Sequence, residues 1–409
     1  MTGSERPYWT AQETADALGV TKATLYAYTS RGQLRSEPLP GQPRERRYYR
    51  EDIERLLERK ELRRDPAKAA ARGLHWGSPV LDSGITLIHE GKFYYRGQDA
   101  LKLAQERTLE EMAELLWEAE PAERGCLFEQ TPVLSPGQLA RLRSCAEARA
   151  NNGPLTLLQT ALPFAGGADL ASYDLRPEGV RLTGARIARL LTTVIAGRHS
   201  VAPIHRSLQA VWAPKKPAAG EVIRIALVLC ADHELNASAF VARCAASAGA
   251  SPYDVVSAAM ATLKGHRHGG AAERLSALFA EAATPARARA VLANRLRRGE
   301  SLPGYGHPLY PMGDPRAAML LKMAEAAGNN AEWQFVRNLA RAGSELQAPP
   351  NLDFGLVAVT RTYGLPVDAP LVLFALGRMI GWIAHAIEQY AAGELIRPRA
   401  RYSGPQPSL

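Results

Sequence analysis

Helical periodicity governs this chain beyond residue 107, and it restricts the body to a mainly α fold. Apolar residues recur at helical spacing in successive segments that turn signals separate. The predicted helices are residues 108–119, 136–150, 184–195, 222–230, 238–248, 253–263, 317–327, 330–339 and 370–390. Two short strand-like runs, 85–88 and 92–96, come before them around a turn at 89–91.

The composition indicates a soluble globular protein. Hydrophobic residues make up 46% of the 409 residues, which is enough for a real core. The four cysteines show neither metal-ligand spacing nor a dense disulfide framework, which favours a reducing compartment. Residues 1–7 are polar and contain no apolar signal core. The most apolar late segment, 371–387, contains Arg378 and His385, which argues against a membrane span. We therefore expect a soluble cytoplasmic protein.

Residues 1–62 are interpreted as a small separate unit. Thr10 and Glu13 form a capping box that opens a short helix, and Gly19 is placed to end that helix. A second predicted helix spans 22–30. Two helices joined by a short glycine-containing turn are typical of a helix-turn-helix.

The rest of this unit has the pattern of a wing, a β-ribbon beside the helix pair. A turn is expected at 38–43, a basic β-ribbon at 44–49 and a third helix at 51–60. The unit resembles the winged helix-turn-helix of MerR-type regulators and excisionase-like proteins over residues 8–60. Residues 63–75 are charged and alanine-rich, which predicts a helical linker.

Positive charge is concentrated in this unit, because residues 31–50 contain six arginines against two acids. Such an excess is a hint of a polyanionic partner, and DNA is the partner that the resemblance implies. The expected major-groove residues are Lys22, Thr24, Tyr26 and Tyr28, and the expected phosphate contacts are Arg44, Arg46, Arg47 and Arg50. The alternatives are a solvated loop and a module that binds another protein.

A glycine-rich stretch at 302–316 has the strongest chemical signal in the body. Asp314 can cap a helix whose first position is Pro315, and Arg316 then lies in the first turn beside free backbone N–H groups. That place suits a bound carboxylate, and His307 can exchange protons with the bound group. The alternative is a loop that merely joins two helices.

Other polar residues lie at similar turns. His233 lies in the polar turn 231–238 between apolar helices, and His268 lies in the glycine-flanked turn 264–271. Asp353 follows a proline pair and precedes a short helix; alone, it would be an ordinary N-cap. A metal site around His268 is a weak alternative, because no nearby cysteine or carboxylate completes a ligand set.

These elements together resemble the citrate synthase family, in order from about residue 84 to residue 404. The matching elements are Gly91-Lys92-Phe93-Tyr94-Tyr95-Arg96-Gly97, Asp232-His233-Glu234-Leu235-Asn236-Ala237-Ser238, Gly265-His266-Arg267-His268-Gly269-Gly270-Ala271, Gly304 to Arg316, Asn351-Leu352-Asp353-Phe354, Gly377 to Gln389 and Ile396-Arg397-Pro398-Arg399-Ala400. The chain departs from the family pattern at Ala272, where asparagine is frequent, and at His266, where proline is common.

The resemblance implies an acyltransferase that joins acetyl-CoA to oxaloacetate and hydrolyses the product to citrate and CoA. Asp353 would remove the α-proton of the thioester, and His268 would donate a hydrogen bond to the thioester oxygen. His307 would give a proton to the attacked carbonyl, and His233 would contact oxaloacetate. No cofactor is expected, because coenzyme A enters as part of a substrate.

Arginine forks suit the two carboxylates of oxaloacetate. Arg316, Arg378 and Arg397 match the family's substrate arginines, and Arg397 would reach the neighbouring subunit, which implies a homodimer. The segment that would recognise coenzyme A is Leu302, Pro303, Gly304, Tyr305 and Gly306.

The expected architecture is two α lobes. Residues 76–265 and 356–409 would form the large lobe, and 266–355 the small lobe. Two alternatives stay open: a 2-methylcitrate synthase that uses propionyl-CoA, and a DNA-binding regulator whose body senses a metabolite.

Overall fold

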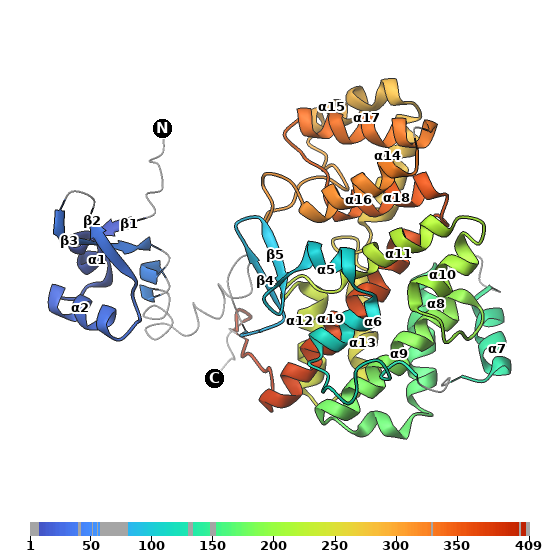
Figure 1. The fold of residues 1–409 in the computed structure, drawn as a ribbon, viewed down its shortest axis with the longest axis horizontal. Coiled ribbons are helices and arrows are strands. Elements are labelled where there is room, and N and C mark those ends of the chain that lie inside the picture. Colours follow the sequence, from blue (N-terminus) through green and yellow to red (C-terminus); the bar gives the residue numbers. More distant parts are fainter. Residues whose placement is uncertain are drawn as a thin grey trace. The chain divides into compact units, whose positions relative to one another are not determined.

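The computed structural model describes residues 8–39, 42–50, 52–54, 56–57, 81–129, 134–147, 153–328, 330–400 and 402–405. The chain divides into two compact units (Figure 1). Residues 83–397 form the larger unit, called the body below. Residues 1–82 with 398–409 form the smaller one, called the N-terminal unit.

The N-terminal unit has the predicted helix-turn-helix and a small antiparallel sheet with the strand order β1-β3-β2. Its elements are β1 (Tyr8–Thr10), α1 (Ala11–Leu18), α2 (Lys22–Ser30), β2 (Ser36–Leu39) and β3 (Gln42–Tyr49). The capping box of Thr10 and Glu13 and the left-handed Gly19 after α1 are confirmed. A small core of Leu18, Leu25, Leu34, Tyr48 and Ile53 holds helices and sheet together.

Sequence patterns misjudged parts of this unit. Strand β1 was not predicted, because three residues are too few to show alternation. The predicted turn at 38–43 is wrong in its extent, because Leu39 already pairs with Gln42 across the ribbon. Of the predicted helix 51–60, residues 52–54 and 56–57 are helical, and the others lie outside the described residues, as does the linker 63–75.

The body begins with a small sheet that bears out the predicted hairpin. Its strands are β4 (Thr86–His89), β5 (Lys92–Tyr95) and β6 (Gln98–Asp99). The phenol of Tyr95 is buried and hydrogen-bonds the carbonyl oxygens of Val228 and Asp232, both at 3.1 Å. It thereby satisfies carbonyls at the end of a helix, which have no partner within the helix itself.

The rest of the body is helical, and the mainly α prediction is confirmed. Its helices are α5 (Ala100–Glu106), α6 (Leu109–Leu116), α7 (Pro136–Glu147), α8 (Pro154–Gly166), η1 (Leu170–Tyr173), α9 (Pro177–Ala196), α10 (Ile204–Trp212), α11 (Pro217–Cys230), α12 (Ala237–Ser247), α13 (Pro252–Leu263), α14 (Ala271–Ala282), η2 (Pro285–Arg287), α15 (Ala288–Arg297), α16 (Pro315–Ala326), α17 (Ala331–Glu345), α18 (Leu352–Tyr363) and α19 (Ala369–Ala392).

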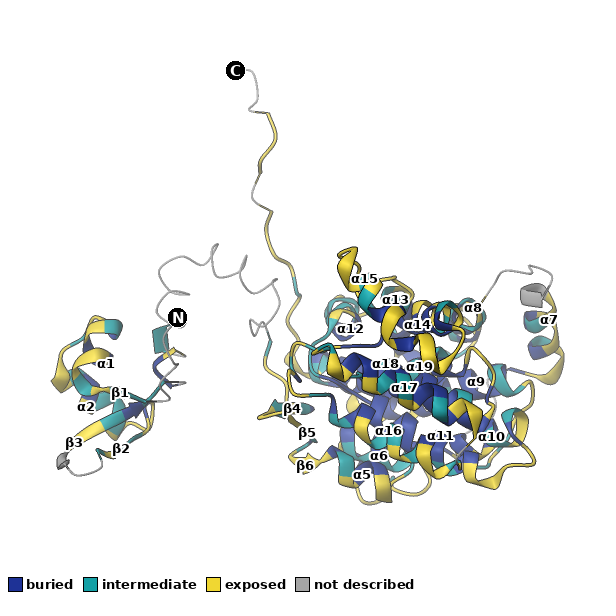
Figure 2. Ribbon diagram, turned by 90° about the horizontal axis from the view of Figure 1, so that it is seen from above, coloured by how far each residue is buried: buried dark blue, intermediate teal, exposed yellow. Residues whose placement is uncertain are grey.

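Helix α19 lies at the centre of the body. It packs against α9, α11, α12 and α13, and most of its residues are buried (Figure 2). Among the described helices it is the one long and apolar enough to cross a membrane, and 83% of its most apolar window is buried inside the protein. Burial in the core therefore accounts for its apolar character.

Helices α14 to α18 gather at one end of the body (Figure 1). Within this group α16 packs against α18 and α15 against α17. Helix α18 runs without a break through the predicted lobe boundary at 355/356. The two lobes with these limits stay a prediction.

Candidate active site

The predicted site residues of the body lie in loops and at helix ends, apart from one arginine. His233 lies in the loop between α11 and α12, and His268 in the turn between α13 and α14. His307 lies in the loop before α16, and Asp353 in the first turn of α18. Arg378 lies inside α19. Residues distant in sequence therefore depend on the packing of these helices to come together.

His233 and His307 are in direct contact, with ring centroids 5.1 Å apart and ring planes nearly perpendicular. Tyr310 packs against both rings, and its Oη lies 2.9 Å from Nε2 of His233. Burial, with Arg316 nearby, lowers the pKa of His307 to about 4 and that of His233 well below its usual value. Both imidazoles are therefore neutral at pH 7.

The protein also fixes which nitrogen of His307 carries the proton. The backbone N–H of Leu309 donates to Nδ1 at 3.2 Å. A neutral imidazole has one proton, so a ring that accepts at Nδ1 carries it on Nε2. His307 is thus a neutral hydrogen-bond donor through Nε2.

Close backbone packing shapes the turn that holds His268. A Cβ on Gly269 would lie 2.3 Å from the carbonyl oxygen of Leu263, and one on Gly270 would lie 3.0 Å from the Cα of His266. The turn therefore needs a glycine at 269 and has little room for a side chain at 270. His266, one of the departures from the family pattern, is exposed on the outer side of this turn.

Ser238 holds the ring of His268. Its Oγ lies 2.8 Å from Nε2 of His268, donates to Oδ1 of Asn236 at 2.8 Å, and accepts the indole N–H of Trp382 at 3.1 Å. The Asn236 oxygen already accepts the backbone N–H groups of Ser238 and Ala239. Ser238 therefore fixes the orientation of the His268 ring through Nε2.

Phe374 connects His268 with Arg378. The His268 ring meets Phe374 edge-on at 5.9 Å, and the Arg378 guanidinium carbon lies 4.8 Å from the Phe374 centroid. Burial, with Arg378 contributing, lowers the pKa of His268 to about 4. Arg378 is 1% exposed, and its Nε donates to the carbonyl of Cys230 at 2.8 Å. Across the described residues it forms no ion pair, which leaves this buried cation available for an anionic ligand.

Asp353 is not a helix cap, and the alternative raised from the sequence is wrong. Asn351 is the N-cap of α18, and its Oδ1 accepts the backbone N–H groups of Asp353 and Phe354. Burial raises the pKa of Asp353 to about 6, against the opposing field of Arg316. The carboxyl group can therefore exchange protons near neutral pH.

Asp314 and Pro315 open α16 as the sequence predicts. Asp314 also forms a two-point ion pair with Arg316, from Nε at 3.0 Å and Nη2 at 2.8 Å, and both side chains are buried. Its Oδ2 accepts the backbone N–H of Leu352 at the start of α18. The pair thus joins α16 to the helix of Asp353 and holds Arg316 in place. A role of Arg316 in binding substrate stays a prediction.

The predicted coenzyme A segment, 302–306, pairs with the segment before α18. Gly306 N–H donates to the carbonyl of Pro349 at 2.7 Å, and Asn351 N–H donates to that of Gly304 at 2.9 Å. Gly304 and Gly306 both have positive φ. The segment is therefore anchored beside the first turn that holds Asp353.

Other predicted residues are placed differently. Arg397 is exposed in the segment after α19, and among the described residues of the chain it has no contact with the other site residues. In the N-terminal unit Lys22 and Tyr26 are exposed, whereas Thr24 and Tyr28 are partly buried.

The wing arginines differ in their partners. Arg46 is exposed and donates to the carbonyl of Ser36, whereas Arg47 pairs with Glu37 and packs over the ring of Tyr8. Arg50 pairs with Glu54. The side chain of Arg44 lies outside the described residues.

Tyr310 and Ser238 were missed as site residues. Both lie inside motifs that the sequence singled out: Tyr310 follows His307 by three residues, and Ser238 ends the His233 turn. The available signal was a polar group near a candidate histidine, but an aromatic or hydroxyl residue there is also compatible with plain packing.

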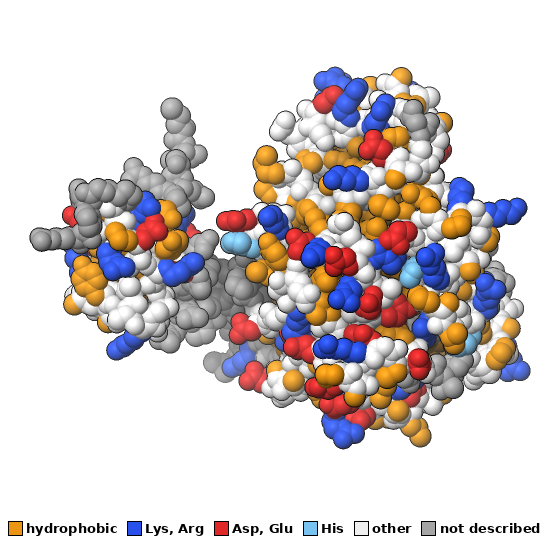
Figure 3. Space-filling model, viewed as in Figure 1, with side chains coloured by type: hydrophobic (Ala, Val, Ile, Leu, Met, Phe, Trp, Pro, Cys, Tyr) orange, Lys and Arg blue, Asp and Glu red, His pale blue; other side chains and the backbone are white. Residues whose placement is uncertain are grey.

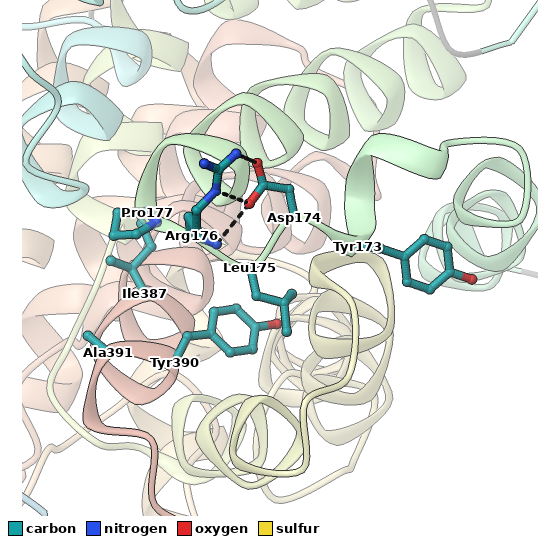
Figure 4. A pocket seen from close by; sticks show the side chains of 8 residues that line it. All are labelled: Tyr173, Asp174, Leu175, Arg176, Pro177, Ile387, Tyr390 and Ala391. Carbon is teal, nitrogen blue, oxygen red and sulfur yellow. Dashed lines mark hydrogen bonds and ion pairs between the residues drawn. The ribbon is translucent and has the colours of Figure 1, made fainter.

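A cavity of about 530 Å³ lies where the start of α9 meets the end of α19 (Figure 4). Leu175, Ile387 and Tyr390 line it, and Arg176 pairs with Asp174 at its edge. None of the site residues above lines this cavity. Among the described residues, no group of three or more His, Cys, Asp or Glu side chains is arranged to hold a metal ion.

Comparison with known proteins identifies the class. Residues 73–399 match the family described as "Citrate synthase, C-terminal domain", and residues 9–61 match "Helix-turn-helix domain". The chain belongs to the citrate synthase family, and it is an acyltransferase with an N-terminal helix-turn-helix domain. In this family coenzyme A takes part as a substrate, and no metal or resident cofactor is needed.

Named relatives and a solved structure agree with this assignment. "Citrate synthase 2" of Bacillus subtilis (strain 168) is 31% identical over 360 residues, which cover 82% of this chain and 96% of the relative. A "2-methylcitrate synthase" of Mycobacterium tuberculosis (strain H37Rv) is 30% identical over 332 residues, covering 76% and 84%. The Thermoplasma acidophilum citrate synthase, solved as a ternary complex with carboxymethyl coenzyme A and oxaloacetate, matches with a TM-score of 0.70 and 25% identity, covering 83% and 97%.

Proposed function

We propose that the body condenses acetyl-CoA with oxaloacetate and hydrolyses the resulting thioester to citrate and CoA. The carboxylate of Asp353 removes a proton from the α-carbon of the thioester, while His268 hydrogen-bonds the oxygen that gains charge. The enolate carbon then attacks the carbonyl of oxaloacetate, and the alkoxide formed there takes the Nε2 proton of His307, which water restores. Water finally cleaves the thioester and releases the thiol of CoA.

The observation that carries this proposal is Asp353, whose pKa burial raises to about 6. A base with that pKa is ionised at neutral pH and strong enough to share an α-proton with an acceptor. Arg378, buried and without an ion pair among the described residues, supplies a fork for one carboxylate of the oxo acid. We further propose that residues 302–306 hold the nucleotide end of CoA, and that closure of the two lobes excludes water.

Release of free thiol from acetyl-CoA in the presence of oxaloacetate tests the proposal. Asp353→Ala and His307→Ala should each lose most of the turnover. His89→Ala is the matched control, because His89 is exposed on β4 outside the site. Full turnover in both site variants would refute the mechanism.

A second acyl substrate is favoured by one observation: relatives named 2-methylcitrate synthase match about as well as those named citrate synthase. Propionyl-CoA differs from acetyl-CoA by one methylene, which is worth only about 1–3 kcal/mol in discrimination. Comparing kcat/KM for the two thioesters decides between them. A ratio above one for propionyl-CoA would assign the chain to the second activity.

We also propose that this soluble, cytoplasmic enzyme works as a homodimer in which Arg397 completes the partner's site. Large hydrophobic side chains are exposed along consecutive elements of the body, at Phe164, Leu170, Tyr173 and Leu182 (Figure 3 shows one face of the molecule with its hydrophobic side chains). Exposed hydrophobic side chains of this size are candidates for a subunit interface. Arg397 has no partner among the described residues of its own chain.

Mixed dimers test this directly. Homodimers of Arg397→Ala and of Asp353→Asn should both be nearly inactive. In a mixed dimer, the Arg397→Ala chain keeps its own Asp353 and receives Arg397 from the other chain, so one functional site returns. If Arg397 acted within its own chain, the mixture would stay inactive.

The N-terminal unit, we propose, binds double-stranded DNA. The start of α2 exposes Lys22 and Tyr26, and Arg46 is exposed on the neighbouring ribbon without an ion pair among the described residues. These groups can meet phosphates, whereas the charge of Arg47 is already paired with Glu37.

Fluorescence anisotropy of the full chain with mixed-sequence duplex DNA at low salt tests this second role. Alanine at Lys22 or Arg46 should weaken binding, and the salt slope should fall by about one for each phosphate that the variant no longer neutralises. His89→Ala is a control for surface change. Absence of binding at low salt would make the unit a module for protein partners.

A further inference from the structure

Tyr310 makes a buried contact with His233 that the proposed reaction does not yet use. The phenol is 1% exposed and the imidazole 8% exposed, with Oη and Nε2 2.9 Å apart. Tyr310 lies in the loop before α16, whereas His233 lies between α11 and α12, so the bond joins two separate loops. Consecutive turns hold Tyr310, because its N–H donates to the carbonyl of His307 and its carbonyl accepts from Gly313.

Either atom of this hydrogen bond could be the donor. Either the phenol donates to Nε2, or Nε2–H donates to the phenol oxygen. A phenol is a far stronger acid than a neutral imidazole N–H, and an imidazole nitrogen is a far stronger base than a phenol oxygen. The first arrangement is therefore favoured. The Arg316 guanidinium carbon, 5.3 Å from the centroid of the Tyr310 ring, favours it further by drawing negative charge toward the phenol oxygen.

The other two site imidazoles follow the same pattern. His307 accepts the backbone N–H of Leu309 at Nδ1, and His268 lies within hydrogen-bond distance of the Ser238 hydroxyl at Nε2. In each ring one nitrogen is occupied by a protein group. The neutral ring of His307 is thus left with its single N–H on Nε2.

We propose that Tyr310 is a positioning residue that holds His233 as the neutral Nδ1–H tautomer, so that the ring acts as a donor toward the oxo acid. The consequence for catalysis rests on the proposed function, but the tautomer itself does not. Without the phenol, the proton can move to Nε2. The ring would then present a lone pair at Nδ1, which repels a carbonyl or carboxylate oxygen.

Nitrogen NMR of full-length protein labelled with ¹⁵N-histidine tests the tautomer without any substrate. In the unsubstituted protein, Nδ1 of His233 should give the signal of a protonated ring nitrogen and Nε2 that of an unprotonated one. A His233→Asn sample assigns the signals. Protonation at Nε2, or at both nitrogens, would overturn the proposal even if the enzyme is fully active.

Tyr310→Phe then tests the cause. Its His233 signals should move toward an average of the two tautomers, and kcat/KM for oxaloacetate should fall about tenfold, as expected when a buried hydrogen bond is removed. KM for the thioester should change less than about twofold, since the phenol contacts the oxo-acid side of the site. Tyr363→Phe is the matched control, because its buried phenol donates to the carbonyl of Met323, outside the site.

The outcomes separate the two proposals. Unchanged His233 signals in Tyr310→Phe would refute the positioning role. The expected signals in a protein that does not condense either thioester would keep the tautomer assignment and refute the proposed function.

Discussion

Arg47 of the N-terminal unit and Arg378 of the body show how differently the two regions treat positive charge. Arg47 lies near the surface, is paired with Glu37 and covers the ring of Tyr8. Arg378 is buried, and its guanidinium contacts a backbone carbonyl and an aromatic ring. The charge of Arg47 is therefore balanced within the protein, without a ligand. Arg378 is left as a buried cation that an anion would stabilise, which is the condition that a binding site needs.

The comparison also shows that a count of arginines can overstate the free positive charge of a segment. The basic stretch 31–50 suggests a large free charge, but Arg35 pairs with Asp52, Arg47 with Glu37 and Arg50 with Glu54. In the body, by contrast, one arginine inside an apolar helix carries more functional information than the whole basic stretch.

The largest effect should come from removing the carboxyl of Asp353. Asp353→Asn should lower kcat by about a thousandfold or more, because a general base contributes roughly 10²–10⁴-fold. The same change should leave folding intact or improve it by roughly 1–3 kcal/mol at pH 7. Steady-state kinetics and urea unfolding measure the two effects.

The sign of that stability change follows from the pKa. The folded-state pKa of Asp353, about 6, lies above its ordinary value of 3.8. Ionisation of this group therefore lowers the stability of the protein as pH rises from about 4 to about 6. The advantage of the asparagine variant should grow across that window and stay constant above it. A variant that is less stable than the parent protein at pH 7 would contradict the assigned burial.

Arg378→Lys should raise the KM for oxaloacetate by about 10–100-fold, because lysine keeps the charge but loses the fork that binds a carboxylate. Arg243→Lys is the informative control. Arg243 is also buried, but it is paired with Glu388 and Gln389 outside the site. Arg243→Lys should lower stability and leave the KM for oxaloacetate unchanged. An equal change of KM in the two variants would show that Arg378 has no special role in binding.

The pH profile should show a smaller effect from the same site. With Asp353 as base, kcat/KM should fall about tenfold per unit below pH about 6. His268 and His307 have pKa values of about 4, so they stay neutral over that range and do not contribute a limb. An acid limb centred near 4 would assign the essential proton to one of these histidines instead.

The smallest effect is expected in the N-terminal unit. Arg47→Ala should lower the unfolding free energy of that unit by roughly 1 kcal/mol, as expected for one partly exposed ion pair with a cation–π contact. Arg46→Ala should leave it unchanged. Urea unfolding followed by the fluorescence of Trp9 would measure both, and equal losses would show that the two arginines are not distinct in role.

Sequence patterns were most successful where local chemistry decides the structure. The Thr10 capping box and the Asp314-Pro315 helix start are as predicted. Helices with an unusual pattern were missed. In α8, Pro163 interrupts the helical signal, and α15 buries only a few apolar side chains.

The candidate site residues come from the sequence, but their arrangement in space could not be predicted from it. Local rules made Asp353 an equally good cap, and only the structure shows Asn351 in that role. The bond between Tyr310 and His233 joins residues 77 positions apart, so no local pattern can reveal it. Burial, which sets the pKa values here, likewise depends on helices that meet only after folding.

The pairing between 304–306 and 349–351 has a further consequence for the proposed reaction. One stiff strip of backbone would touch the nucleotide of the thioester and also carry the base that acts on its far end. The distance between the nucleotide-binding segment and Asp353 would then be fixed. A thioester bound by its nucleotide would place its acyl carbon at a set distance from the base. Thioesters with a shortened arm would then react poorly even when their acyl group is correct.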